Sequence, residues 1–462
     1  MKAVGDFMSA VSDWIWGLPL VILLMGGGLF FLIYSRFLPF RYLRHAVNVL
    51  RGKYDDKNDP GDINHFQALS GALAATVGMG NISGVALAIV AGGPGVLFWM
   101  WMSAFVGMAT KYFTCTLAVM YRGKDSNGDV QGGPMYVITE GLGKNWKPLA
   151  IFFCVEGFFG ATPVFQANQI VDVVGAIILE PMGISLDSNW TRLYIGIGIA
   201  VPAALVILGG IKRIGAVASK LVPSMVLLYT GCVIVILAIN YDSILPSFGM
   251  IFEQAFTLKG AGWGIFLALM IEGAKRAAFS NEAGVGTAPL MHGAAKTTEP
   301  VREGLVAMLG PAIDTLIVCT MTGLAILVTG LWQSDSTSAI DAILLTAAAF
   351  GQGLGGFGTA ALTLCVLVFA FTTIFSFAYY GRKCLAYLIG VKYGVLFDYW
   401  YVAIILIGSV ASLDIVVSVI FIAYGLMAIP TMISAIILAP KVMEASKRYF
   451  DAFNKSVSNK QE

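Results

Sequence analysis

The sequence predicts an all-α polytopic membrane protein, and three observations lead to that fold class. Hydrophobic residues make up 58% of the chain and charged residues only 12%, about half the charged share of an ordinary soluble domain. The mean hydropathy is +0.80. Many apolar stretches are long enough to cross a bilayer as a helix. We therefore expect residues 1–462 to form a single integral membrane domain.

Eleven spans are expected in order along the chain. A leading helix covers 17–37. Ten further spans follow, near 66–92, 95–121, 148–178, 193–210, 216–240, 262–293, 303–332, 357–389, 396–413 and 416–440. The stretches between them are short, and residues 441–462 are expected to form a tail. The six Cys residues lie in or beside these spans without a CxxC pair, so we expect buried thiols.

The distribution of positive charge predicts the orientation. If the loop after the leading helix is cytoplasmic, the outer segments hold only Lys2, Arg192 and Lys259 of the 29 Lys and Arg residues. The positive-inside rule then places the N-terminus outside and the C-terminus in the cytoplasm. We expect a multi-pass protein of the cytoplasmic (inner) cell membrane. The net charge of +2 and the absence of a basic tract indicate no nucleic-acid partner.

The ten spans after the leading helix divide into two halves of five, 66–240 and 262–440. An odd number of spans makes the halves inverted relative to each other. The first span of each half is Gly-rich and interrupted at mid-depth, by "TVGMGNISG" in one and "FSNEAGVGTAP" in the other, so Asn81 and Asn281 stand at matching places. Broken helices at matching places in inverted halves indicate the substrate site of a transporter.

The first break, at Gly78, Met79, Gly80 and Asn81, suits two ligands of opposite charge. Free amide groups where a helix begins attract a carboxylate, here near Gly80. Free carbonyl groups where a helix ends suit a hard cation, and those of Ala75 and Gly78 would face sodium. An amino-acid zwitterion with a sodium ion fits both. The alternative is that the small residues only allow close helix packing.

Signs of an enzyme are absent from the sequence. "GGPG" is not followed by the Lys and Ser or Thr of a phosphate-binding loop. His45, His65 and His292 are scattered and predict no metal cluster. We therefore expect a protein that is not an enzyme and not an ATP-driven pump.

Several motifs together resemble the alanine or glycine:cation symporter family. They are "ATVGMGNISGVALAIVAGGPGVLFWMW", "GGPMY", "FSNEAGVGTAP", "AAKTTEPVREGLVAMLGPAIDTLIVCTMTGL", "YYG" and "GLMAIP", and they reach from Ala75 to Pro430. The resemblance implies a LeuT-like fold, a 5+5 inverted repeat with one preceding transmembrane helix. It implies sodium-coupled, sometimes proton-coupled, uptake of small neutral amino acids such as alanine and glycine, and a functional monomer.

The resemblance also assigns individual residues. Phe279 would cover the substrate, Asn281 would hydrogen-bond it, and Gln166 would face it. Thr372 and Thr373 would complete the sodium site with the first break, and Phe377 would close the pocket. The open alternatives are that Gln166 only joins helices and that the two Thr hydroxyls bond to their own helix.

The chain departs from the usual family pattern at positions that bear on the substrate. Met79 replaces a common Thr, and Phe377 replaces a Trp. Because Phe is smaller than Trp, a larger amino acid such as glutamine is the alternative substrate. An amino-acid sensor that does not transport is a weaker alternative, since no soluble domain is appended.

Four charged residues in the spans have open roles. Glu282 is either a scaffold residue or a ligand. Asp314 either binds a cation or pairs with Arg276. Lys275 and Arg276 are expected to form a structural or gating pair with Glu272, Glu156 or Asp314, because a charge inside a membrane is costly.

Overall fold

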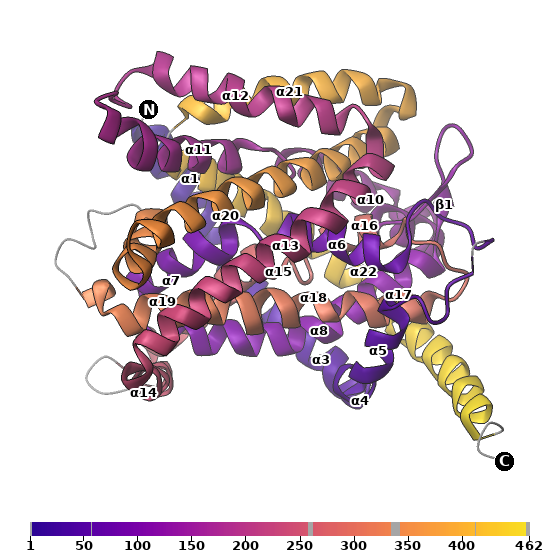
Figure 1. Ribbon diagram of the computed structural model, residues 1–462. Coiled ribbons are helices and arrows are strands. Elements are labelled where there is room, and N and C mark those ends of the chain that lie inside the picture. The colour runs from indigo at the N-terminus through magenta and orange to yellow at the C-terminus, as the bar shows by residue number, and fades with distance from the viewer. Residues whose placement is uncertain (1, 57, 257–261, 334–341, 412, 459–462) are drawn as a thin grey trace.

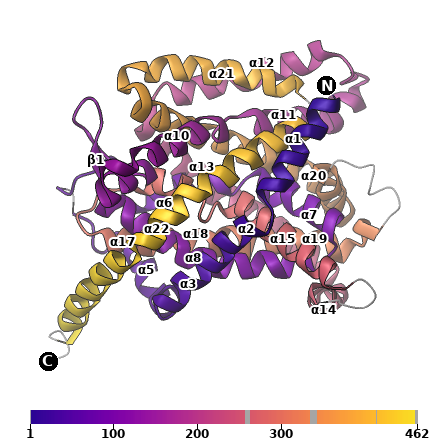
Figure 2. The same ribbon diagram turned by 180° about the vertical axis from the view of Figure 1, so that it is seen from behind.

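The protein is a bundle of helices with one short β-hairpin (Figure 1). The computed structural model describes residues 2–56, 58–256, 262–333, 342–411 and 413–458. Most helices run between two opposite ends of the molecule and pack around a continuous apolar core. The N-terminus and the C-terminus lie at opposite ends, as both views show (Figures 1 and 2).

The leading segment is longer than predicted and is bent. It consists of α1 (Lys2–Ile15), α2 (Leu18–Val21), a π-helical turn (Ile22–Gly26) and α3 (Gly27–Tyr34). The axes of its two parts differ by 46°. Pro19 occupies the first turn of α2, where its missing N–H breaks no helical bond. The prediction of one leading helix over 17–37 missed α1, since Asp6 and Asp13 interrupt its apolar pattern.

The next elements carry the first predicted half. They are α4 (Leu38–Arg41), α5 (Leu43–Leu50), α6 (His65–Thr76), α7 (Val85–Gly92), α8 (Val96–Met120), β1 (Gly123–Lys124), β2 (Val130–Gln131), α9 (Pro134–Tyr136), α10 (Lys147–Gly160), α11 (Val164–Val174), α12 (Asn189–Ile207), α13 (Gly210–Ile239) and α14 (Ile244–Ala255). The two strands pair antiparallel, with Gly123 opposite Gln131. A π-helical turn (Gly80–Gly84) joins the break after α6 to α7.

The remaining elements carry the second predicted half. They are α15 (Gly262–Asn281), α16 (Thr287–His292), α17 (Pro300–Ala307), α18 (Leu309–Pro311), α19 (Thr320–Thr329), α20 (Ala342–Ile389), α21 (Gly394–Val410) and α22 (Leu413–Ser458). A π-helical segment (Ala312–Cys319) lies between α18 and α19. Gly355, with a φ of 62°, kinks α20. The predicted tail 441–462 is instead helical through Ser458, because α22 continues past Pro440.

Nine of the eleven predicted spans meet a test of length and hydropathy. Seven described helices are long and apolar enough to cross a membrane, and two bent pairs raise the number to nine. The predicted spans outside that group are α8 and the pair α15 and α16. Since α8 packs against α15 and α17, it lies within the bundle. Eleven spans and a five-plus-five division remain predictions.

The helices are paired across the two predicted halves. α13 packs against α20, α10 against α20 and α22, and α12 against α21. The pair α12 and α21 forms one edge of the molecule in both views (Figures 1 and 2). The six Cys residues are free and buried, which confirms that prediction.

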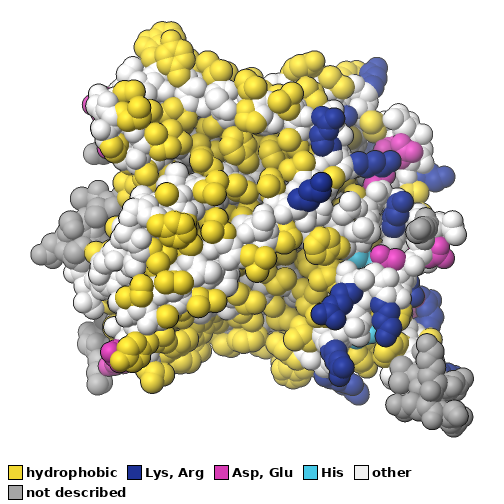
Figure 3. Space-filling view, in the orientation of Figure 1, with side chains coloured by type: hydrophobic (Ala, Val, Ile, Leu, Met, Phe, Trp, Pro, Cys, Tyr) yellow, Lys and Arg dark blue, Asp and Glu magenta, His cyan; other side chains and the backbone are white. Residues whose placement is uncertain are grey.

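Basic side chains are concentrated at one end of the molecule (Figure 3). Lys and Arg side chains gather at one end, around α5, α17 and β1, and apolar side chains cover the middle (Figure 3). We call this the basic end. Lys259, predicted on the other side, lies outside the described residues, and Arg192 pairs with Asp172 at 3.2 Å. The basic end agrees with the sorting of charge in the sequence, and the orientation itself remains a prediction.

Candidate substrate and cation site

The first break has the geometry of a helix that stops and begins again. α6 ends at Thr76, Val77 has extended backbone, and the two helix axes meet at 52°. The amide N–H of Gly78 donates to Asn81 Oδ1 at 2.8 Å. Asn81, in the first turn of the restarted helix, thereby satisfies the amide group of Gly78 in the break, and the amide groups of Met79 and Gly80 lie at the positive end of that helix.

The second break is held open by left-handed backbone. Glu282, Gly284 and Gly286 have φ values of 54°, 87° and 106°. A left-handed Glu is strained, and the contacts of its buried carboxylate hold it in place. Its Oε1 accepts from Tyr424 Oη at 2.7 Å and its Oε2 from Thr287 Oγ1 at 2.5 Å. These contacts join the break to α22 and α16. They agree with a scaffold role for Glu282 rather than with a role as a ligand.

The two breaks meet in the centre of the bundle. A Cβ atom at Gly80 would lie 3.2 Å from Ser280 Cα and 3.4 Å from the Phe279 carbonyl oxygen. Glycine allows this approach without the shift of a few tenths of an ångström that a side chain would demand. Segments that are about two hundred residues apart in the sequence therefore lie against each other, and their use as one substrate site remains a prediction.

Asn81 and Asn281 both reach the π-helical segment Ala312–Cys319. Asn81 Nδ2 donates to Asp314 Oδ1 at 2.8 Å and to Ser280 Oγ at 3.2 Å. Asn281 Nδ2 donates to Thr315 Oγ1 at 2.9 Å. The two side-chain amides join the breaks to the predicted span 303–332. The sequence analysis did not foresee this connection.

Asp314 is fully buried and does not pair with Arg276. Its Oδ2 accepts from Ser280 Oγ at 2.5 Å and from Thr315 Oγ1 at 2.8 Å. Arg276 instead pairs at 2.5 Å with Glu272, which lies one helical turn earlier in α15. Glu272 is one of the partners expected for Arg276, and the alternative in which Asp314 pairs with Arg276 is wrong.

Lys275 has a partner that the sequence did not reveal. Its Nζ lies 3.0 Å from Asp13 of α1 and 4.8 Å from the centre of the Phe421 ring. The structural pair expected at this position thus joins α15 to the part of the leading segment that the prediction missed.

Helix α11 forms a third wall of the site. The Phe165 ring lies 5.3 Å from that of Phe279, and Ser83 Oγ of the first break donates to Gln169 Oε1 at 2.9 Å. Gln166 lies in α11 and Thr162 lies in the irregular segment just before it, and the two are 4% and 5% exposed. Among the described residues, Gln166 Oε1 and Thr162 Oγ1 have no hydrogen-bond partner.

Unsatisfied buried polar atoms are uncommon in native proteins and ask for an explanation. Two such atoms close in sequence to Phe165 and Gln169, which contact the two breaks, are what a site for a polar ligand requires. The sequence analysis missed Thr162, which lies before α11 and therefore gave no helical-spacing signal.

Helix α20 supplies hydroxyl groups to the end of α6. Thr373 Oγ1 donates to the carbonyl oxygen of Ala74 at 3.0 Å, and Ser376 Oγ donates to that of Gly71 at 3.0 Å. A Cβ atom at Gly78 would lie 2.7 Å from Thr373 Oγ1. Thr372 Oγ1 bonds within its own helix, to Phe369 O at 2.9 Å. The side chains that face the break are therefore Thr373 and Ser376, one turn apart.

Aromatic rings surround Phe279. Besides Phe165, its neighbours are Phe421 and Tyr424, with ring centres 5.0 and 6.3 Å away. Phe377 is buried and its ring neighbour is Tyr380, at 6.1 Å. Met79 and Ala75 are buried as well. The aromatic side chains beside Phe279 thus include Phe421 and Tyr424 of α22, a helix to which the sequence analysis gave no part in the site.

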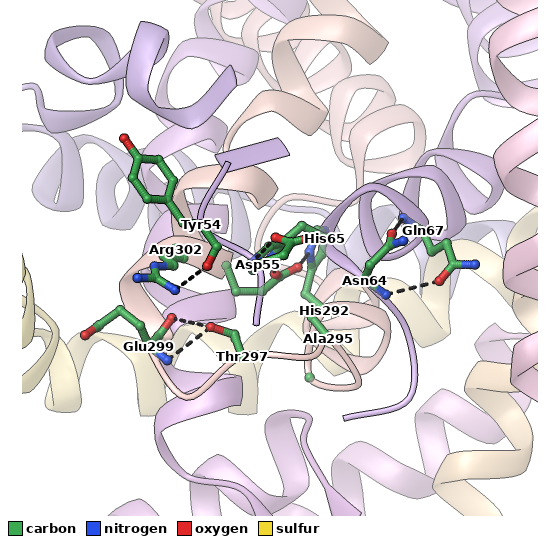
Figure 4. Close-up of polar contacts among 12 residues, drawn as sticks. Tyr54, Asp55, Asn64, His65, Gln67, His292, Ala295, Thr297, Glu299 and Arg302 are labelled. Carbon is green, nitrogen blue, oxygen red and sulfur yellow. Dashed lines mark hydrogen bonds and ion pairs between the residues drawn. The ribbon is translucent and has the colours of Figure 1, made fainter. Parts of the chain in front are cut away.

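At the basic end the two interrupted helices are tied together (Figure 4). Glu303 of α17 is buried, and each of its carboxylate oxygens contacts the Nδ1 atom of a histidine. Oε2 contacts His65 of α6, and Oε1 contacts His292 of α16 at 2.5 Å. Arg122 donates to the carbonyl groups of Gly293, Ala295 and Thr297. α6 and α16 are the halves of the two broken spans on this side, so these contacts fix them relative to each other.

Comparison with known proteins assigns the chain to a family. A sequence profile of the Sodium:alanine symporter family matches residues 1–462. The chain belongs to that family. It is 40% identical over 453 residues to the sodium/alanine symporter AgcS of Methanococcus maripaludis, covering 96% of this chain and 97% of the relative. It is 33% identical to a probable sodium/glutamine symporter, GlnT of Bacillus subtilis, covering 97% and 91%.

The architecture also resembles a solved transporter structure. MhsT in complex with L-phenylalanine aligns with a TM-score of 0.58 at 12% identity, covering 84% of this chain and 98% of that one. The likeness shows a LeuT-type fold. Membership of the Sodium:alanine symporter family makes the chain a multi-pass membrane transporter rather than an enzyme.

Proposed function

We propose that the protein imports a small neutral amino acid, alanine or glycine, together with sodium. The observation that carries this proposal is the meeting of the two breaks, Gly80 against Ser280, beside the unpartnered Gln166. The amide groups of Met79 and Gly80 would hold the substrate carboxylate, and Gln166 Oε1 would accept from its ammonium group. Asn81 and Asn281 would fix the two breaks, and Phe279 would cover the substrate.

Sodium would bind between α6 and α20. The hydroxyl group of Thr373 and carbonyl groups at the end of α6, including those of Ala75 and Gly78, are hard oxygen ligands of the right kind. Both Thr hydroxyl groups lie within bonding distance of the Phe369 carbonyl oxygen in their own helix, and Thr373 is favoured because it also reaches Ala74 of α6. Ser376 is an additional hydroxyl group on the same face as Thr373.

The charges in the centre support coupling to one positive ion. Asp314 and Glu282 are two buried carboxyl groups, and Lys111 of α8 is a buried amino group. With all three groups ionised, their charges would sum to one negative unit, and a buried net charge is costly. A sodium ion, or a proton as the alternative, would neutralise it.

Transport would follow from movement of one group of helices against the rest around the central site. Sodium bound beside the substrate would stabilise the substrate-ready state, and by linkage the substrate would tighten sodium binding equally. We propose eleven spans in a five-plus-five arrangement, a cell-membrane location with the N-terminus outside, and a functional monomer.

The test is uptake of radiolabelled amino acids into proteoliposomes with and without an inward sodium gradient. Accumulation of alanine or glycine only with sodium would support the proposal. Equal uptake in choline would contradict sodium coupling, and uptake that follows a proton gradient would assign the positive ion as a proton.

Glutamine is the second candidate substrate, favoured by Phe377 at a usual Trp position and by the relative named a sodium/glutamine symporter. We expect Phe377→Trp to narrow the accepted substrates to glycine and alanine, because the larger ring takes up pocket volume. An unchanged substrate profile in competition assays would exclude this reading.

A further inference from the structure

A second feature of the molecule, far from the breaks, is a basic recess where α3 ends. It has a volume of about 580 Å³ and lies between the turn after α3 and the last part of α22. Arg36, Arg41 and Lys447 line it, together with one acidic residue, Asp451. All four side chains are exposed, so the recess carries a net charge of two positive units.

The positive groups in this recess lack acidic partners. Within the described ranges, Arg36, Arg41 and Lys447 form no ion pair, whereas other basic residues such as Arg192 and Arg382 do. Three unpaired positive groups around one hollow suit an anion with several oxygen atoms, such as a phosphate group.

The backbone at this point is strained in a way that shapes the recess. Arg36 and Phe37 are consecutive non-glycine residues with left-handed φ values of 52° and 59°. Their amide groups donate to Ile33 and Leu32, each at 2.9 Å, which is the ending of a helix that usually has glycine. An arginine retained where glycine would be unstrained is an outlier that points to function.

The recess lies where the lipid-facing surface of α3 gives way to charge. Leu29, Phe30 and Ile33 of α3 are 48%, 41% and 57% exposed, and Tyr34 follows at 41%. Exposed apolar side chains followed by a Tyr and then by Arg mark the boundary between hydrocarbon and head groups. A phospholipid can therefore lay its acyl chains on α3 and reach the recess with its phosphate group.

We propose that this recess binds the head group of an anionic phospholipid and thereby holds the leading segment against α22. α3 packs against α22 along this line, and the ring of Tyr42 stacks on that of Phe450, with centres 3.7 Å apart. Figure 2 shows that α3 and α22 both run toward the basic end. Basic pockets between membrane helices are recognised sites for such head groups.

The test measures lipid binding by the purified full-length protein with native mass spectrometry and thermal melting. The probes are dioleoylphosphatidylglycerol, dioleoylphosphatidylcholine and soluble glycerol phosphate. A variant with Arg36→Gln, Arg41→Gln and Lys447→Gln is compared with a control that changes three basic residues outside the recess, Arg51→Gln, Lys392→Gln and Lys441→Gln. Both lose three positive charges.

We expect phosphatidylglycerol to bind more tightly than phosphatidylcholine. Each charge removed from the recess should weaken this binding about fivefold, and the control variant should bind as the wild type does. Asp451→Asn should strengthen binding, a gain that a misfolded protein could not give. Equal losses in the two triple variants, equal binding of both lipids, or full competition by glycerol phosphate would each overturn the proposal.

Discussion

At the scale of the residue, function depends on which polar atoms are already used. Gln169 and Gln166 are three residues apart on α11, yet one accepts from Ser83 and the other has a buried oxygen without a partner. The side-chain atoms of Asn81 are bonded to Asp314 and to Gly78, and these contacts hold the break together. Residues of the same type therefore divide into those that hold the structure and those available to a ligand.

The contrast between the two glutamines gives a testable prediction. Gln166→Met should leave the thermal stability of the substrate-free protein unchanged, because the oxygen it removes has no partner. It should weaken substrate affinity about tenfold, the effect of losing one hydrogen bond to a charged group. Gln169→Met should lower stability by about 1 kcal/mol, since it leaves Ser83 without its acceptor. Thermal melting and substrate titration measure both, and the reverse pattern would contradict the assignment.

Gly80 gives a second prediction at this scale. Gly80→Ala should cost about 1–3 kcal/mol in stability or in substrate binding, because its methyl group meets the backbone of Ser280 and Phe279. The matched control is Gly231→Ala in α13, where a Cβ atom has nothing within 4 Å and alanine is the better helix former. The two variants should therefore shift the melting temperature in opposite directions, and equal shifts would argue against close approach of the breaks.

At the scale of the element, each broken span is a pair of half-helices with separate attachments. The half-helices α6 and α16 are joined at the basic end through Glu303, and α7 packs against α15 on the other side of the breaks. A half-helix can tilt without unfolding if the hydrogen bonds at its break rearrange. This division suits a protein that must open its central site to one side at a time.

Glu303 is the residue on which that attachment depends. Glu303→Gln should lower stability by about 2–3 kcal/mol, since one amide cannot replace a carboxylate that receives two imidazole groups. The control is Glu444→Gln, which removes an exposed partner of Lys441 and should leave the melting temperature unchanged. Hydrogen exchange should rise in α6 and α16 of the Glu303 variant, and unchanged protection there would refute the coupling.

At the scale of the whole molecule, helix α5 contacts the last helix of the chain, α22. α5 follows the leading segment, and α22 is the last helix. A hydrogen bond of 2.9 Å joins Nε2 of His45 in α5 to Oη of Tyr449 in α22. Nδ1 of the same ring is buried and has no hydrogen-bond partner among the described residues. Burial, and then the charges of Arg302 and Lys53, lower the pKa of His45 below 6.5.

This contact predicts a dependence of stability on pH. Because the pKa of His45 is lower in the folded state, the unfolded chain takes up the proton first as the pH falls. The stability that His45 contributes should be constant above about pH 6.5 and should decrease as the pH falls toward the lowered value. In melting curves between pH 5 and 8, His45→Phe should flatten this decrease relative to the wild type, and parallel curves would exclude the effect.

The sequence by itself determined the class of the protein and the positions of its two breaks. Membrane helices and interruptions at Gly78–Gly80 and after Asn281 depend on local hydropathy and on the conformational preferences of glycine, which neighbouring residues fix. The motifs from Ala75 to Pro430 sufficed to indicate the family that the comparison then showed. The interior carboxylate of Asp314 was visible as an anomaly, although its partners were not.

Only the tertiary structure decided how the side chains of the site are used. It turned Thr373 rather than Thr372 toward the carbonyl groups of α6, brought Ser376 and Thr162 into view, and paired Arg276 with Glu272 instead of Asp314. It also extended the leading segment by α1 and placed Asp13 beside Lys275. The physical reason is that a buried polar group needs a partner in space, and in a bundle that partner comes from whichever distant helix packs against it.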